Sequence, residues 1–183
     1  MQILLTLLVL LATQVPREER IKKALVEGAR TRLGDAYDSD YYANGYPPKG
    51  KSACVDVLYF ACQRVSLDLQ NEVDKDIQRR PDLYPSIRDR AINHRWAPNL
   101  IVYFRRHWHV LPNDSQWEKG DVVFWSLTDD GVADHCGLVT NPPFVIHQFP
   151  PLCAEHPVLL GWKVMGHFRH PEAGSSRAKP KGR

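Results

Sequence analysis

The sequence has little cysteine, no CxxC pair and no long hydrophobic run, and each shortage excludes a class of protein. Four cysteines in 183 residues are too few for a disulfide scaffold, and their separation gives little support to a structural zinc site. The longest apolar run, residues 3–12, is about half the ~20 residues that a membrane-spanning helix needs. With 43% hydrophobic and 25% charged residues, the composition is that of one globular domain rather than a disordered, collagen-like or polytopic membrane protein.

The net charge is small and lies at one end of the chain. There are 24 basic and 21 acidic residues, a net charge of +3, and residues 172–183 supply all of it with four basic residues against one acidic residue. The remainder is neutral on balance, so we expect no nucleic-acid partner. Residues 171–183 are low in apolar side chains and are predicted to form a disordered basic tail.

The apolar run at residues 3–12 has the length of a signal-peptide core. Two small residues, Ala12 and Thr13, lie at its end before Pro16, whereas no lysine or arginine precedes it. We therefore predict a signal peptide over residues 1–16, an exported protein that is periplasmic or secreted, and no stable membrane span after cleavage. The alternative is a buried N-terminal helix, which would need burial on all sides.

The hydrophobic period changes from helical to strand-like at Gly120. Apolar spacing predicts helices over residues 21–33, 52–65 (with Ser52 as N-cap) and 98–107. Residues 35–52 are predicted as an ordered loop, and residues 68–89 as an irregular or short-helix insertion. Strands are predicted over 121–125, 135–140, 144–149 and 162–169, with a loop at 150–161. Because these strands follow one another without helices, we predict an antiparallel meander and an α+β fold, in a single catalytic domain over residues 17–170.

Cys54 is the candidate nucleophile. A loop rich in glycine and proline leads to it at the start of the second predicted helix, where backbone N–H groups and the helix dipole favour the thiolate. The alternative for a helical cysteine is a buried core residue. That alternative fits Cys62, on the apolar face of the same helix, better than it fits Cys54.

His135 and His147 are the candidate base and its partner. They lie on consecutive antiparallel strands. If the connecting turn centres on Asn141, the two histidines are directly opposite; if it centres on Pro142, they are one step diagonal. A regular three-residue loop favours the first arrangement. We predict a Cys-His-His site in which Cys54 attacks, His135 is the general base and His147 orients the imidazole.

Four stretches resemble the NlpC-type cell-wall peptidases, a papain-like superfamily. They are Ser52–Asp56, Gly120–Trp125, His135–Val139 and Val145–His147, in the order of that superfamily's cysteine, Gly-Asp and histidine motifs. The stretch Leu33–Tyr37 is similar to its Gly-x-x-Tyr motif, whose tyrosine lies beside the nucleophile. The resemblance implies an NlpC-type, papain-like fold with the nucleophile helix packed on a C-terminal antiparallel sheet. It also implies a substrate-binding or oxyanion role for Tyr37.

A closer resemblance, over residues 30–169, is to a bacterial family of exported proteins that is catalogued as a domain of unknown function and grouped near the NlpC-type peptidases. It is carried by the stretches at residues 37–42, 44–48, 93–95, 98–100 and 161–163. The chain departs from the NlpC-type pattern beside the nucleophile. Ala53 stands where aspartate is usual, and Val55-Asp56 stands where Ser-Gly is usual.

Three further polar residues are candidates for a supporting role. His94 with Arg95 could bind an anionic group of a substrate, and Gln148 could support the site by hydrogen bonding. We expect all three in solvated surface positions instead.

The sequence thus predicts a thiol hydrolase that cleaves an amide bond, and the resemblance implies an amide of cell-wall peptidoglycan peptides. No metal or organic cofactor is required. A metal site is disfavoured because His135 and Cys136 are adjacent on a strand and point to opposite faces. We expect a monomer. One alternative is a cell-wall-binding module that kept the fold and lost catalysis. Another is a thiol redox protein, for which Cys62 lies too far along the helix from Cys54 to serve as partner.

Overall fold

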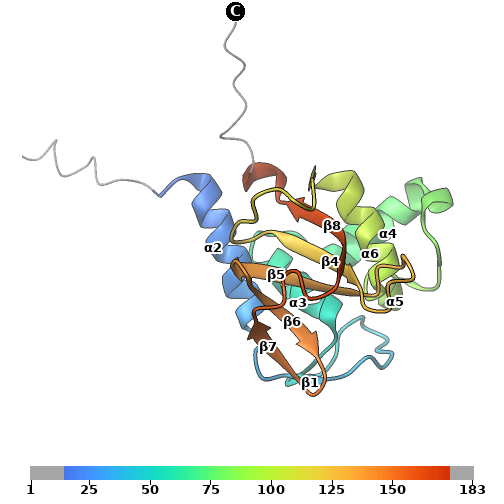
Figure 1. Cartoon of the computed structure of the whole chain (residues 1–183). Helices are drawn as coiled ribbons and strands as arrows, with labels where there is room; N and C mark the ends of the chain where they lie inside the picture. Colours follow the sequence, from blue (N-terminus) through green and yellow to red (C-terminus); the bar gives the residue numbers. More distant parts are fainter. Residues whose placement is uncertain (1–14, 174–183) are drawn as a thin grey trace, which may run out of the picture.

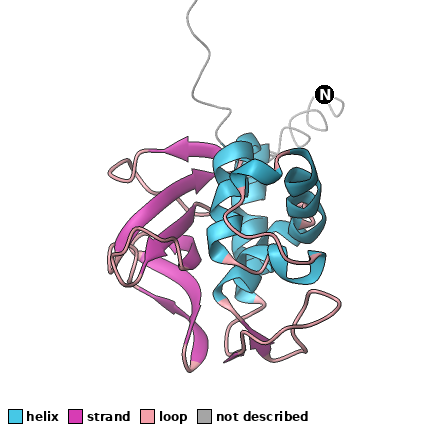
Figure 2. Cartoon of the chain, turned by 90° about the vertical axis from the view of Figure 1, so that its right-hand side faces the viewer, coloured by secondary structure: helices cyan, strands magenta, loops and turns pink. Residues whose placement is uncertain are grey.

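The computed structural model describes residues 15–173, which form one eight-stranded sheet with helices gathered against one side of it (Figures 1 and 2). The helices are α2 (Arg17–Arg30), α3 (Cys54–Gln63), α4 (Leu69–Arg79), α5 (Arg90–Asn93) and α6 (Ala97–His107). The strands are β1 (Ala36–Tyr37), β2 (Lys51–Ser52), β3 (His109–Leu111), β4 (Val122–Ser126), β5 (His135–Asn141), β6 (Phe144–Phe149), β7 (Leu152–His156) and β8 (Lys163–Arg169). The predicted α+β fold is confirmed.

The spatial order of the strands is β2-β1-β7-β6-β5-β4-β8-β3. Strands β4, β5 and β6 are consecutive and antiparallel as predicted, and β7, instead of the predicted strand at 162–169, continues the meander. The last long strand, β8, does not extend it, because β8 crosses to the far side and pairs antiparallel with β4. The prediction of a loop over residues 150–161 is wrong in part, because residues 152–156 form β7 beside β6. Prolines flank this strand on both sides but none lies inside it, so they bound the strand without removing its hydrogen-bond donors.

Helix α3 is the central helix and carries the candidate nucleophile. It packs between α2 and the sheet, and its side chains Val57, Leu58 and Ala61 are completely buried. The helix begins at Cys54, not at Ser52, which lies in β2. The N-terminal cap comes from within the helix, because the Asp56 carboxylate accepts a hydrogen bond of 2.7 Å from the Ala53 N–H.

The segment predicted as an irregular insertion contains a regular helix, α4. Leu69, Val73 and Ile77 are spaced four residues apart and all three are buried in the main core. Asp68 caps this helix by accepting from the Asn71 N–H at 3.1 Å. Most residues of this segment are polar, but they leave a narrow apolar stripe along the helix. Such a stripe is enough to pack a helix that buries only one side against the core.

Two predictions concern the ends of the chain. The predicted signal peptide, residues 1–16, lies almost wholly outside the described residues. The tail predicted from residue 171 starts too early, because residues 171–173 form a 3-10 turn in which Ala173 is buried, and residues 174–183 lie outside the described part. In residues 15–173 no helix is both long and apolar enough to cross a membrane.

Candidate active site

The Cys54 sulfur lies at the N-terminus of α3, where this helix meets the beginning of β5. The side chain is half-buried, and its sulfur is hydrogen-bonded to the Cys136 thiol, to the His135 ring and to the Cys136 backbone N–H. The Cys136 hydrogen bond, followed by the hydrogen bond and charge of His135, holds the pKa of Cys54 well below its usual range despite burial, which acts the other way. Cys54 therefore has the environment of a reactive thiolate.

The two predicted histidines are in contact. His135 Nε2 and His147 Nδ1 are 2.8 Å apart, and both rings are buried. The register differs from the favoured prediction. Leu138 pairs with Ile146 and Val139 with Val145, so the histidines are one step diagonal rather than opposite. The hairpin is irregular beyond Val139, which shifts the register that a regular three-residue loop would set.

A third histidine continues the chain of rings, and sequence analysis missed it. His147 Nε2 lies 3.1 Å from Nδ1 of His156, an exposed residue at the end of β7. Burial, followed by the charges of His135 and His156, lowers the pKa of His147 to about 3, so this middle ring is neutral at ordinary pH. No alternation of apolar and polar residues marks 152–156 as a strand, so the sequence carries no clear signal for His156.

Aromatic rings enclose the histidine pair. The Trp125 ring stacks on His135 with centroids 5.4 Å apart, and Trp162 and Phe149 meet both histidines. Trp125 is completely buried, and its indole N–H donates to the Leu159 carbonyl at 3.0 Å. These rings exclude water from the His135–His147 hydrogen bond, which strengthens it.

A buried ion pair between Asp56, in the first turn of α3, and Arg95 holds that turn in place. Arg95 Nε and Nη2 each lie 3.0 Å from a carboxylate oxygen of Asp56, and the two side chains are 2% and 0% exposed. Arg95 also donates to the carbonyls of Asp38 and Asp40, at 3.3 and 2.7 Å. The predicted solvated position of Arg95 is therefore wrong, because the guanidinium joins the nucleophile helix to the loop after β1.

His94 and Gln148 are also buried, against expectation. The His94 ring packs against Tyr46 and Tyr59, and burial lowers its pKa to about 4. The Gln148 side chain donates from Nε2 to the Asp35 carbonyl at 3.0 Å and so ties β6 to the turn before β1. Sequence reasoning could not place these residues because polar side chains are buried only when particular distant partners meet them.

Tyr37 is near the nucleophile along the backbone but not joined to it. Tyr37 on β1 pairs with Ser52 on the parallel strand β2, and Ser52 precedes Cys54 by two residues. Its side chain is 45% exposed, and it makes no hydrogen bond or ring contact to the cysteine–histidine cluster in the described part of the chain. Its predicted role therefore stays a prediction.

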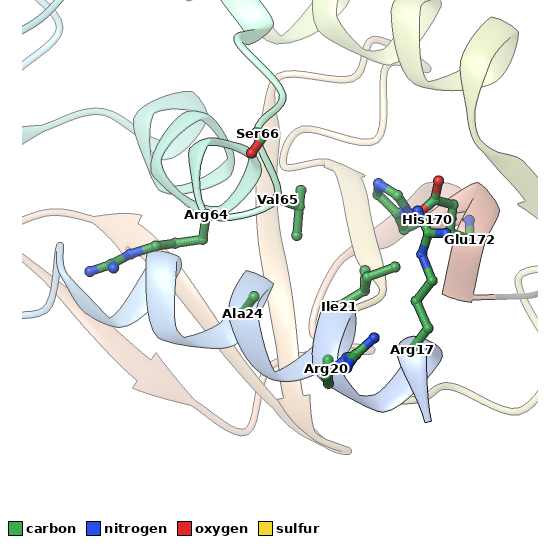
Figure 3. Close-up of a pocket in the computed structure, with 9 residues that line it drawn as sticks. All are labelled: Arg17, Arg20, Ile21, Ala24, Arg64, Val65, Ser66, His170 and Glu172. Carbon is green, nitrogen blue, oxygen red and sulfur yellow. Dashed lines mark hydrogen bonds and ion pairs between the residues drawn. The ribbon is translucent and has the colours of Figure 1, made fainter. Parts of the chain in front are cut away.

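A separate hollow of about 330 Å³ lies at the other end of α3, between α2 and the C-terminal 3-10 turn (Figure 3). Its lining includes Arg17, Arg20 and Arg64. Because α3 has 10 residues and a helix rises ~1.5 Å per residue, this hollow is ~15 Å along the helix from Cys54. Within residues 15–173 no group of three or more His, Cys, Asp or Glu side chains is arranged to hold a metal ion.

Comparison with known protein families gives one match over most of the chain. The family described as "Domain of unknown function (DUF1287)" matches residues 26–170. The uncharacterized protein YijF of Escherichia coli (strain K12) is 33% identical over 178 residues, which cover 86% of this chain and 86% of that protein.

Solved structures share the fold at low sequence identity. The peptidoglycan hydrolase RipB of Mycobacterium tuberculosis has a TM-score of 0.56 and 14% identity, with 85% of this chain and 68% of that chain covered. NlpC1 of Trichomonas vaginalis has a TM-score of 0.54 and 14% identity, with 87% of this chain covered. This chain spans about half of the NlpC1 chain, 46% of its length. The predicted NlpC-type fold is confirmed.

Proposed function

This chain belongs to the DUF1287 family, and from this premise we propose that it is a cysteine hydrolase that cleaves amide bonds. The observation that carries the proposal is the Cys54 sulfur hydrogen-bonded to the ring of His135, which is in turn hydrogen-bonded to His147. A thiolate paired with an oriented imidazole is the arrangement that nucleophilic catalysis requires.

In the proposed reaction the Cys54 thiolate attacks the amide carbonyl carbon, and the C=O π electrons move to the oxygen. As the C–N bond breaks, the His135 imidazolium gives its proton to the leaving nitrogen, and a thioester remains on Cys54. Water then attacks the thioester while His135 takes a proton from it, which releases the acid product and restores the thiolate–imidazolium pair. The first N–H groups of α3 have no partner within the helix and can stabilise the oxyanion, and Tyr37 is the candidate to assist them.

The proposed substrate class is an amide in the peptides of cell-wall peptidoglycan. The support is the fold, which is shared with a protein described as a peptidoglycan hydrolase. Export to the periplasm or beyond, action as a monomer and independence of cofactors complete the proposal. The competing candidate is a cell-wall-binding module on the same fold, for which the Cys54 thiol would be dispensable.

The test compares the reduced protein with its Cys54→Ala, His135→Ala and Cys62→Ala variants. Cys62 is the matched control, because it lies on the same helix in an apolar setting where burial raises the pKa of its thiol. We expect iodoacetamide to alkylate Cys54 rapidly at pH 6 and Cys62 slowly, and His135→Ala to remove the fast reaction.

In the same samples, peptidoglycan stem peptides should be cleaved by the parent protein and by Cys62→Ala only, as read by mass spectrometry. Alkylation of Cys54 no faster than that of Cys62 would remove the chemical basis of the proposal. Fast alkylation together with peptide binding that survives Cys54→Ala, and no cleavage, would favour the binding module.

A further inference from the structure

We propose that His156 is a positioning residue whose unprotonated Nδ1 holds the His135–His147 pair in the tautomer that catalysis needs, so that protonation of His156 switches the thiolate off. The inference rests on the proposed function, because it concerns how the base of Cys54 is kept ready. It adds a fourth residue, on a different strand, to the cluster of Cys54 and two histidines.

The three histidines form a diagonal across one face of β5, β6 and β7. In the observed register Ala154 is opposite His147 on β7, and extension of the β5–β6 pairing sets Gly137 opposite it on β5. His135 precedes Gly137 by two residues and His156 follows Ala154 by two, so each is a diagonal neighbour of His147. The residues directly opposite His147, Gly137 and Ala154, are therefore small. The His147 ring can pass over them and reach the rings of its diagonal neighbours on β5 and β7.

The order of the ring nitrogens decides which tautomers are compatible. His135 uses Nε2 toward His147, which leaves Nδ1 for the Cys54 sulfur. For Nδ1 of His135 to take a proton from Cys54, its Nε2 must carry a proton and donate to Nδ1 of His147. A neutral His147 then carries its own proton on Nε2, where the acceptor is Nδ1 of His156.

Protonation of His156 reverses this order. A protonated Nδ1 of His156 cannot accept a hydrogen bond, so it donates to Nε2 of His147. The neutral His147 ring must then carry its own proton on Nδ1. His147 then donates to Nε2 of His135, and the neutral His135 carries its proton on Nδ1, facing the sulfur. In that state His135 cannot act as a base toward Cys54.

His156 lies at the solvent-exposed end of the chain of histidine rings. The His156 ring is exposed, and it contacts the ring of His147 on β6. Its neighbour on β7, Glu155, points to the opposite face, where Thr140 donates to its carboxylate and Arg30 lies 3.8 Å away. Of the ionisable groups on β6 and β7 in the described residues, only His147 contacts the His156 ring.

The experiment measures the pH dependence of Cys54 alkylation by iodoacetamide in the parent full chain and in the variants His156→Ala, His156→Asn and His109→Asn. Asparagine places a non-titrating acceptor oxygen near the position of Nδ1, so it is the conservative replacement. His109, an exposed histidine on β3, is the control.

At pH 7 we expect His156→Ala to slow alkylation by roughly three- to tenfold, the worth of one hydrogen bond. His156→Asn should restore the rate and move the acid limb of the profile to lower pH, while His109→Asn should match the parent protein. A merely structural role would not move the limb and would not be rescued by asparagine.

Two results would overturn the inference. One is a His156→Asn profile that superimposes on the parent profile, and the other is a His156→Ala variant that reacts at the parent rate across the whole pH range. If His156→Ala fails to fold, the His156→Asn profile still decides. Peptide cleavage, measured in parallel, separates the two proposals. Cleavage without any effect of His156 leaves the hydrolase and removes the relay, whereas a His156-dependent profile without cleavage does the reverse.

Discussion

Removal of the Arg95 guanidinium tests whether the buried ion pair holds the nucleophile helix in place. Arg95→Met keeps an unbranched side chain but deletes the charge and all four hydrogen bonds, two to the Asp56 carboxylate and two to backbone carbonyls. The Asp56 carboxylate would then be buried with no cation beside it. Loss of one member of a buried pair costs about 3–5 kcal/mol of unfolding free energy, mostly from the stranded charge.

For a chain of this size each kcal/mol lowers Tm by about 2–4 °C, so the expected fall is about 6–20 °C. Urea unfolding followed by circular dichroism gives the free energy directly. The double variant Asp56→Asn with Arg95→Met should recover part of the loss, because no charge is then stranded and the amide oxygen can still accept from the Ala53 N–H.

Arg106→Met is the matched control. Arg106 is also bidentate, at 2.7 and 3.1 Å to Asp76, but its side chain is 28% exposed, and Asp76 keeps Tyr84 as a donor at 2.6 Å. This variant should lose less than Arg95→Met. An Arg95→Met variant no less stable than Arg106→Met, or a double variant as unstable as Arg95→Met alone, would refute the stranded-charge explanation.

Three further predictions follow from single residues. Cys136→Ala should raise the pKa of Cys54 and Cys136→Ser should raise it less, as read from alkylation rate against pH, because serine keeps a side-chain donor and alanine does not; equal profiles would exclude the thiol contact. His94 has a pKa of about 4 when folded and an ordinary value near 6.5 when unfolded, so the unfolded chain takes up the proton first. The contribution of His94 to the free energy of unfolding should therefore be fully present above pH 6.5 and fall by up to about 1.4 kcal/mol per pH unit below it. His94→Phe should flatten that fall in urea titrations from pH 7 to 4.5. Gly28→Ala should destabilise despite the gain in helix propensity, because its methyl group would collide with a backbone carbonyl oxygen of α3, and a higher Tm would contradict that packing.

Local pattern was enough for some parts of this protein. Helical spacing located α2 and α6, because one buried face imposes its period on the residues that form it. Short apolar runs bounded by turn residues located β4, β5 and β6, which are buried on both faces. The same period put His135 and His147 on one face whether they were opposite or diagonal. Cys54 could be singled out because a helix N-terminus acts on a thiol within one turn.

Other parts depended on partners that are far away in the sequence. The Arg95–Asp56 pair joins residues 39 apart, and the Cys54–Cys136 contact joins residues 82 apart, so no local signal distinguishes these side chains from solvated ones. The register of the β5–β6 hairpin was decided by an irregularity in its turn.

The sequence by itself determined α2, α3, α6, β4, β5, β6 and β8 and the chemical types at the site, since apolar periodicity and the effect of a helix N-terminus act within a few residues. Only the tertiary structure decided that β7 lies beside β6, which brings His156 to His147, and that Cys136 rather than Cys62 meets the nucleophile. The reason is physical: hydrogen bonds and ion pairs act over about 3 Å, and only the packed sheet and helices bring such distant residues that close.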